Sequence, residues 1–271
     1  MVQVAAVNCY SHLLKSFGGE QLSSSSLIVG LLLCDTVHDY LLDSTGGDFD
    51  HIFSKCLSQV DDNFTYKAYR THLGELPNSV DECDVWLING SPNSVYYDLS
   101  WIKNLIGFVQ QVHTVKKPLV GICFGHQIIA TALGGKVEKS DQGWGVGMAH
   151  YPVTQAAKWM QPKLDHYNIW VFYQDQVTEL PKNAQILSGD DFCPAFMVQY
   201  DEFTMSIQGH PELIKDFFTK VLNSDEFDHL LDVRAQGLAN LDGETSSLIL
   251  FTWIANFLRQ AHATNLRSHN T

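Results

Sequence analysis

One cysteine in this chain lies where a nucleophile can be held. An apolar run at 118–122 predicts a buried strand, and a helical apolar pattern follows at 124–133. Cys123 falls between them, close to Gly121 and Gly125, which indicates a tight strand-to-helix turn. The N-terminus of the following helix would favour the thiolate, the attacking form of cysteine. A small buried cysteine at a strand end has the same local pattern, so the turn alone leaves both interpretations open.

A histidine and a carboxylate two residues apart could serve such a cysteine. His210 and Glu212 follow an apolar run at 203–208. In extended backbone, residues i and i+2 lie on the same face, and Pro211 restrains the link between them. The spacing therefore allows the Glu212 carboxylate to orient the His210 imidazole.

A third segment could stabilise an oxyanion. The apolar run at 84–88 predicts another buried strand, and Asn89-Gly90-Ser91-Pro92-Asn93 follows it directly. A glycine-containing loop at the end of a strand can present backbone N–H groups to negative charge that develops during a reaction.

Together, these segments resemble the signature blocks of class I (triad-type) glutamine amidotransferases. The three blocks are Asn89–Pro92, Gly121–Gln127 and Gln208–Glu212. Further segments are similar to the free-standing, GMP-synthase-like branch of that family: Gly74–Pro77, Val95–Asp98, Gly143–Gly147 and Gln174–Val177. The resemblance extends from about Leu27 to the C-terminus.

The resemblance implies a thioester mechanism with three catalytic residues. Cys123 would attack the side-chain amide carbon of glutamine, and His210 would pass the proton to the departing ammonia. Glu212 would hold the imidazole in the useful tautomer. Water would then hydrolyse the thioester and release glutamate.

The same resemblance implies the remaining contacts. The oxyanion hole would consist of the backbone N–H groups of Phe124 and Ser91. Gly90 and Gln127 would bind the substrate, and Gly90 would also allow the loop its shape. His126 is expected to support the turn rather than transfer protons. Tyr173 departs from the family, because many relatives carry histidine there.

The composition excludes several other classes of protein. The 271 residues include 30 acidic and 17 basic side chains, and this net charge of −13 argues against nucleic-acid and anionic-membrane surfaces. The six cysteines form no Cys-x-x-Cys pair, which favours reduced thiols and a cytoplasmic location. No apolar run is long enough for a membrane span, and the N-terminus lacks a secretory-signal pattern. No histidine spacing predicts a metal site, and no cofactor is expected.

The elements that position these residues alternate between strand and helix before Gly135. This alternation predicts an α/β fold with a mainly parallel sheet and helices on both faces, flavodoxin-like, as in class I glutaminases. Expected strands lie at 27–34, 65–69, 84–88 and 118–122, and expected helices at 49–60, 99–113 and 124–133. Added antiparallel strands are expected at 146–153, 168–173, 184–187, 195–200 and 203–208. Helical patterns follow at 211–222, 225–237 and 245–260.

The segment 35–50 is predicted to be a loop. Residues 1–26 are predicted to be an N-terminal extension, and 27–271 a single class I glutamine amidotransferase domain.

Three functions remain open from the sequence. The first is hydrolysis of the glutamine side-chain amide, with the ammonia received by a separate synthetase subunit, since the chain has no P-loop or acceptor domain. The second is a γ-glutamyl peptidase, which shares the attacked carbonyl and differs only in the leaving amine. The third is a catalytically silent partner-binding subunit, which has no need for all three of Cys123, His210 and Glu212.

Overall fold

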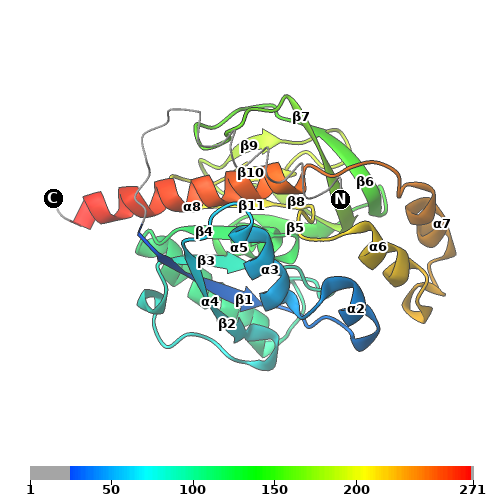
Figure 1. The fold of residues 1–271 in the computed structure, drawn as a ribbon, viewed down its shortest axis with the longest axis horizontal. Helices are drawn as coiled ribbons and strands as arrows, with labels where there is room; N and C mark the ends of the chain where they lie inside the picture. Colours follow the sequence, from blue (N-terminus) through cyan, green and yellow to red (C-terminus); the bar gives the residue numbers. More distant parts are fainter. Residues whose placement is uncertain (1–24, 270–271) are drawn as a thin grey trace.

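The structure, a computed structural model, describes residues 25–269 and is built around a seven-stranded sheet of order β2–β1–β3–β4–β11–β10–β9 (Figure 1). The strands are β1 Leu27–Leu33, β2 Phe64–Arg70, β3 Val85–Ile88, β4 Leu119–Ile122, β9 Gln185–Ser188, β10 Met197–Gln199 and β11 Thr204–Ile207. From β2 to β11 all neighbours are parallel, whereas β10 is antiparallel to both β11 and β9. The predicted α/β fold with a mainly parallel sheet is confirmed.

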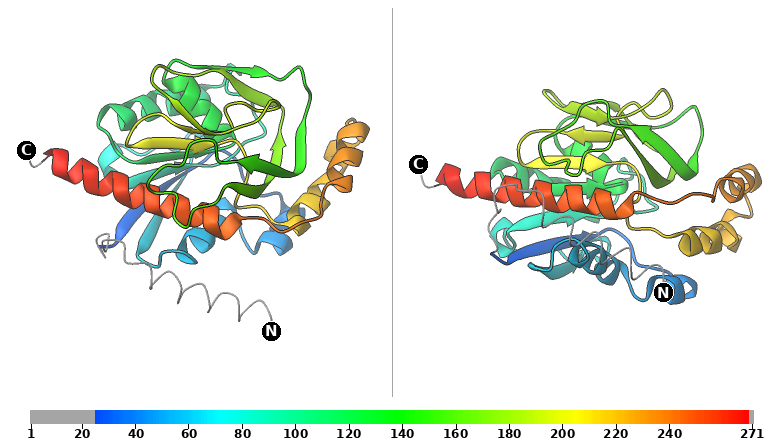
Figure 2. Two further views of the ribbon diagram at one scale, coloured as in Figure 1. Left: turned by 90° about the horizontal axis from the view of Figure 1, so that it is seen from above. Right: turned by 45° about the horizontal axis from the view of Figure 1, so that its top comes forward.

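Helices cover both faces of this sheet (Figures 1 and 2). The covering helices are α3 Phe49–Ser58 and α8 Ser247–His269 on one face, and α4 Ser100–Thr114 and α5 Phe124–Ala132 on the other. In β1, Leu31 and Leu33 join the core beneath α3 and α8, while Leu32 joins the core beneath α4 and α5. A strand buried on both faces must be apolar throughout, which explains the uninterrupted apolar run.

Further elements lie beside the sheet, as Figure 2 shows for the β6–β7 hairpin. Two antiparallel pairs are formed by β6 Gly145–Pro152 with β7 His166–Tyr173, and by β5 Lys136–Lys139 with β8 Asp175–Glu179. The remaining helices are α2 Leu42–Thr45, α6 Lys215–Leu222 and α7 Leu231–Ala239, with 3-10 turns at Asp39–Leu41, Thr71–Leu73, Val80–Glu82 and Asp225–Phe227.

Several sequence-based expectations were wrong in detail. The run at 203–208 was expected among antiparallel strands, but β11 also pairs in parallel with β4 inside the main sheet. The helical pattern at 211–222 begins only at Lys215, because a turn separates it from β11. The segment 35–50 was read as loop, yet it contains two short helical turns. Strands β5 and β8 were not predicted, since β5 has a single buried side chain, Val137.

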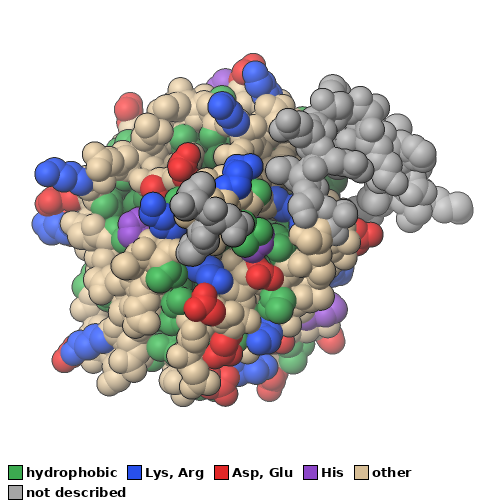
Figure 3. All heavy atoms as spheres, turned by 90° about the vertical axis from the view of Figure 1, so that its left-hand side faces the viewer, with side chains coloured by type: hydrophobic (Ala, Val, Ile, Leu, Met, Phe, Trp, Pro, Cys, Tyr) green, Lys and Arg blue, Asp and Glu red, His purple; other side chains and the backbone are tan. Residues whose placement is uncertain are grey.

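Residues 1–24 of the predicted N-terminal extension, 1–26, lie outside the described residues, and β1 begins at Leu27. Across residues 25–269, no helix is both long and apolar enough to cross a membrane. Where side chains are visible on the face in Figure 3, Lys and Arg lie interspersed with Asp and Glu. That visible area therefore has no extended basic patch of the kind that binds nucleic acid.

Candidate active site

Cys123 lies at the turn between β4 and α5, as predicted. Its backbone has φ 52° and ψ −105°, a conformation that side chains other than glycine rarely adopt. The Cys123 N–H donates to the carbonyl of Ile207 at 2.9 Å, so the neighbouring strand β11 holds the turn in place. Strained backbone at a strand-to-helix turn is the geometry that presents a nucleophile at the edge of a sheet.

The two nearby glycines allow close packing rather than the bend itself. Neither is among the residues with positive φ. A Cβ added to Gly121 would lie 2.3 Å from the carbonyl oxygen of Gly125, and one added to Gly125 would lie 2.4 Å from that of Ile88. The tight turn that the glycines indicated is present and leaves no room for side chains at either position: Cys123 carries the strain, and the glycines let α5 approach β3 and β4.

His210 and Glu212 form a buried pair. Nδ1 of His210 lies 2.8 Å from Oε1 of Glu212, and both residues are less than a tenth exposed. The backbone N–H of His210 donates to the backbone carbonyl of Trp170 in β7 at 2.8 Å, which holds the His210 backbone in place. Burial lowers the pKa of His210, but the charges of Cys123 and Glu212 outweigh it and raise the pKa well above 6.5.

The loop after β3 lies against this pair. A Cβ on Gly90 would lie 3.0 Å from Cε1 of His210 and 3.6 Å from Cβ of Cys123. Ser91 Oγ accepts hydrogen bonds from the backbone and side chain of Asn93 at 3.3 and 3.2 Å, which orders the loop. Among the described residues, neither Ser91 nor Phe124 donates its backbone N–H to a backbone carbonyl in a turn, loop or cap.

A chain of amides leads from α5 to the cysteine. Nε2 of Gln127 donates to the backbone carbonyl of Asp175 at 2.9 Å and to Oε1 of Gln208 at 3.2 Å. Nε2 of Gln208 in turn donates to Sγ of Cys123 at 3.7 Å. Both hydrogens of the Gln127 amide are thus engaged within the protein.

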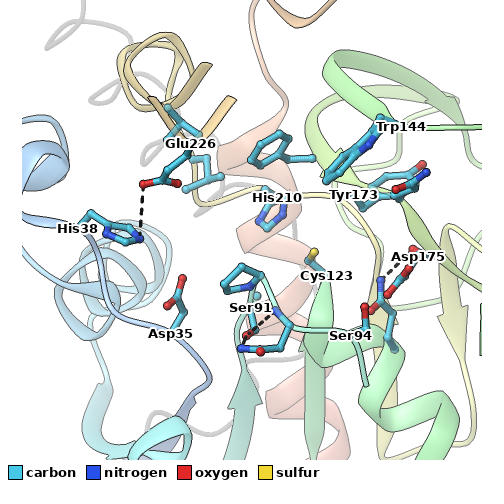
Figure 4. A pocket seen from close by; sticks show the side chains of 18 of the residues that line it. Asp35, His38, Ser91, Ser94, Cys123, Trp144, Tyr173, Asp175, His210 and Glu226 are labelled. Atoms are coloured by element: carbon cyan, nitrogen blue, oxygen red, sulfur yellow. Dashed lines mark hydrogen bonds and ion pairs between the residues drawn. The ribbon is translucent and has the colours of Figure 1, made fainter. Parts of the chain in front are cut away.

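These residues surround a cavity of about 400 Å³ (Figure 4). Six of the seven predicted site residues line it: Gly90, Ser91, Cys123, Gln127, His210 and Glu212. The seventh, Phe124, follows Cys123 directly. They meet because β3, β4 and β11 are adjacent and parallel, so their carboxyl ends share one edge of the sheet.

The cavity continues on both sides of Cys123 (Figure 4). On one side lie Trp144, Tyr173 and Asp175, whose carboxylate accepts from the Tyr96 hydroxyl at 3.0 Å. The other side is lined by Asp35, His38 and Glu226, with His38 Nε2 3.9 Å from Glu226 Oε1. Burial raises the pKa of Asp35. Sequence reasoning did not place Asp35, His38 and Glu226 at the site, because segments that are distant in sequence carry them.

Two residues singled out in the sequence have structural partners. His126 is wholly buried, its Nδ1 lies 2.7 Å from Ser206 Oγ, and burial lowers its pKa to about 3. It is therefore neutral and supports the packing of α5 on β11, as expected. The Tyr173 hydroxyl lies 3.1 Å from that of Tyr151, and a Cβ on Gly145 would lie 2.9 Å from its ring. Gly145 thus makes room for a tyrosine ring in the cavity wall.

The site holds no obvious metal centre. Among residues 25–269, no group of three or more His, Cys, Asp or Glu side chains is arranged to hold a metal ion.

The sequence matches a known family and several individual proteins. Residues 41–230 match the family model described as glutamine amidotransferase class-I. γ-Glutamyl peptidase 5 of Arabidopsis thaliana is 31% identical over 202 residues, which cover 71% of this chain and 78% of that protein. A GMP synthase [glutamine-hydrolyzing] of Azoarcus sp. is 32% identical over 136 residues, covering 47% of this chain and 25% of the synthase.

Solved structures show the same fold. A glutamine amidotransferase from Thermotoga maritima superposes with a TM-score of 0.68 at 17% identity, covering 85% of this chain and 98% of that structure. The family model spans more than two thirds of the sequence and includes the loop after β3, Cys123, His210 and Glu212. The chain therefore belongs to the class I glutamine amidotransferase family.

Proposed function

We propose that this chain hydrolyses γ-glutamyl amide bonds through a thioester on Cys123. The thiol proton passes to His210, and the sulfur attacks the γ-carbonyl carbon of the substrate. The N–H groups of Phe124 and Ser91 stabilise the oxyanion. The C–N bond then breaks, and His210, oriented by Glu212, returns the proton to the leaving amine. A water molecule gives its proton to His210 and attacks the thioester carbon; the C–S bond breaks, glutamate is released, and His210 returns the proton to the sulfur.

The extent of the cavity favours a leaving amine larger than ammonia. The space of about 400 Å³ passes Cys123 and reaches Asp35, His38 and Glu226 on the far side (Figure 4). Its volume falls within the roughly 300–1,000 Å³ of typical small-molecule pockets. If the γ-glutamyl group lies on the Gln127 side, the opposite side accommodates an amino acid or peptide attached through its amine. We therefore place γ-glutamyl peptides ahead of free glutamine as substrates.

The relatives support this order. The matches to γ-glutamyl peptidases 3 and 5 of Arabidopsis thaliana cover 79% and 78% of those proteins, whereas the match to the Azoarcus GMP synthase covers a quarter of the synthase.

Glutaminase activity for a separate synthetase subunit is the second candidate. The observation in its favour is the 32% identity to the glutamine-hydrolysing GMP synthase. Glutamine presents the same γ-carbonyl to Cys123, so the same residues would act on it. This candidate predicts slow hydrolysis by the isolated chain and faster hydrolysis once the acceptor enzyme binds.

Steady-state kinetics of the purified chain distinguish the two candidates. We expect turnover of γ-glutamyl dipeptides and tripeptides without any partner, at a kcat/KM at least about 10-fold above that for glutamine. Cys123→Ala should abolish both reactions. Faster turnover of glutamine than of any γ-glutamyl peptide would favour the second candidate. If wild type and Cys123→Ala are equally inactive on every substrate, the chain is the silent subunit and the proposal fails.

A further inference from the structure

We propose that Gln208 is the thiolate-binding residue of this site, with its amide N–H held toward Cys123 Sγ by Gln127. This inference rests on the proposed role of Cys123 as nucleophile and extends it. Gln208 is completely buried and begins the turn that leads from β11 to His210. Its Nε2 lies 3.7 Å from Sγ of Cys123, within reach of an N–H···S hydrogen bond.

The orientation of the Gln208 amide is determined by its partners. The carbonyl of Asp175 can only accept, so the nearby atom of the Gln127 amide must be its nitrogen, at 2.9 Å. That same nitrogen lies 3.2 Å from Gln208, and it can only donate. The Gln208 atom facing it must therefore be oxygen, which directs the Gln208 nitrogen to Cys123. A single backbone carbonyl thus sets the direction of two side-chain amides.

A fixed donor at the sulfur favours its negative form. Hydrogen bonds from N–H groups are stronger when the acceptor is charged, so the contact strengthens when the Cys123 proton passes to His210. The Gln208 amide has no acidic proton, and it remains a donor throughout the reaction. During hydrolysis of the thioester, the thiolate is the leaving group, and the same N–H stabilises it as the C–S bond breaks. Gln208 therefore acts on both chemical steps.

Alkylation of Cys123 by iodoacetamide tests this role without any substrate. Gln208→Met keeps the approximate length of the side chain and removes the donor. We expect its alkylation rate at pH 7 to fall about 10-fold, with the difference from wild type shrinking as the pH is raised. The matched control is Gln199→Met in β10. The Gln199 amide also makes two hydrogen bonds: it accepts from Trp159 Nε1 at 3.2 Å and donates to the Asp201 carbonyl at 2.9 Å.

Gln127→Glu provides a second variant that leaves Gln208 in place. The new carboxylate cannot donate, so the Gln208 amide turns its nitrogen toward it and its oxygen toward the sulfur. The same loss of alkylation at pH 7 is expected, and Gln127→Glu added to Gln208→Met should produce little further loss. Thermal melting confirms that each variant is folded.

Unchanged pH profiles of alkylation in folded Gln208→Met and Gln127→Glu would overturn the inference. So would an equal change in Gln199→Met. Failure of the proposed function would give a different result. In that case no γ-glutamyl substrate is turned over, but the alkylation profiles of wild type and Gln208→Met still differ.

Discussion

Nδ1 of His210 lies 2.8 Å from Oε1 of Glu212, and the two side chains are buried together beside Cys123. The carboxylate can only accept, so Nδ1 carries the proton and Nε2 is the nitrogen left to exchange a proton with the sulfur. Within the described residues, Oε2 of Glu212 is buried without a hydrogen-bond partner. The Glu212 carboxylate therefore has the His210 imidazole as its hydrogen-bond partner among the described residues.

Replacing Glu212 by Gln should lower kcat strongly. The amide can present its nitrogen to Nδ1, which favours the wrong tautomer, and it removes the charge that stabilises the imidazolium. In the best-studied triads such a change costs about 10⁴-fold in kcat, and we expect a loss of about 10²- to 10⁴-fold here. Steady-state kinetics on a γ-glutamyl peptide measure it. Glu138→Gln, on exposed strand β5, is the control and should retain full activity.

The same pair predicts how stability depends on pH. Because the pKa of His210 is raised above its ordinary 6.5 in the folded protein, protonated His210 stabilises the fold fully below about pH 6.5. That contribution is lost as the pH rises through the pKa that His210 has in the folded protein. The melting temperature of wild type should therefore exceed that of Glu212→Gln by more at pH 6 than at pH 9. An advantage that grows with pH would contradict the assignment.

Among the cysteines that the structure describes, Cys123 should react fastest with a glutamine-like electrophile such as diazo-oxo-norleucine. Burial raises the pKa of Cys34, Cys56 and Cys193 to about 12, so their thiols stay protonated at pH 8. Cys9 lies outside the described residues, so labelling should be performed in a Cys9→Ser background. Mass spectrometry of the digest locates the adduct. Equal labelling after Cys123→Ala would remove the nucleophile assignment.

The site was largely predictable because its parts are encoded locally. Cys123 lies directly between an apolar strand and an apolar helix, and the His210–Glu212 spacing places two groups on one face of extended backbone. The same i, i+2 reasoning relates Gln208 to His210 and would have pointed to Gln208 as well. Which strands lie beside one another was harder to predict. A short apolar run such as 203–208 has the same pattern in parallel and antiparallel sheets, and only the assembled sheet shows β11 beside β4.

Other features depend on contacts between residues that are distant in sequence. No local pattern relates Asp35 to Glu226, yet both line one cavity. The steric demand at Gly121 also depends on such a contact, because a Cβ added there would lie 2.3 Å from the Gly125 carbonyl oxygen, which arrives with the packing of α5.

That packing makes Gly121→Ala a test of fold stability. The new Cβ would overlap the carbonyl oxygen of Gly125, a backbone atom that cannot rotate away. Forcing atoms into a packed core costs roughly 1–3 kcal/mol and occasionally more, and we expect about 3 kcal/mol here. Urea denaturation measures the free energy of unfolding. A loss below about 0.5 kcal/mol would show that α5 moves away from β4 at little cost.

Gly90→Ala should lower activity while largely preserving the fold. Its Cβ would lie 3.0 Å from Cε1 of His210, so the imidazole must move by a few tenths of an ångström away from its position beside Cys123. Small misplacements of reacting groups are costly, and we expect kcat/KM to fall about 10-fold or more. Gly107→Ala in α4 is the matched control, because a Cβ there meets no atom within 4 Å. The control should keep full activity and gain roughly 0.5–1 kcal/mol of stability from the better helix former. Full activity in Gly90→Ala would show that the loop after β3 yields freely, and that Gly90 does not limit the approach of His210 to the nucleophile.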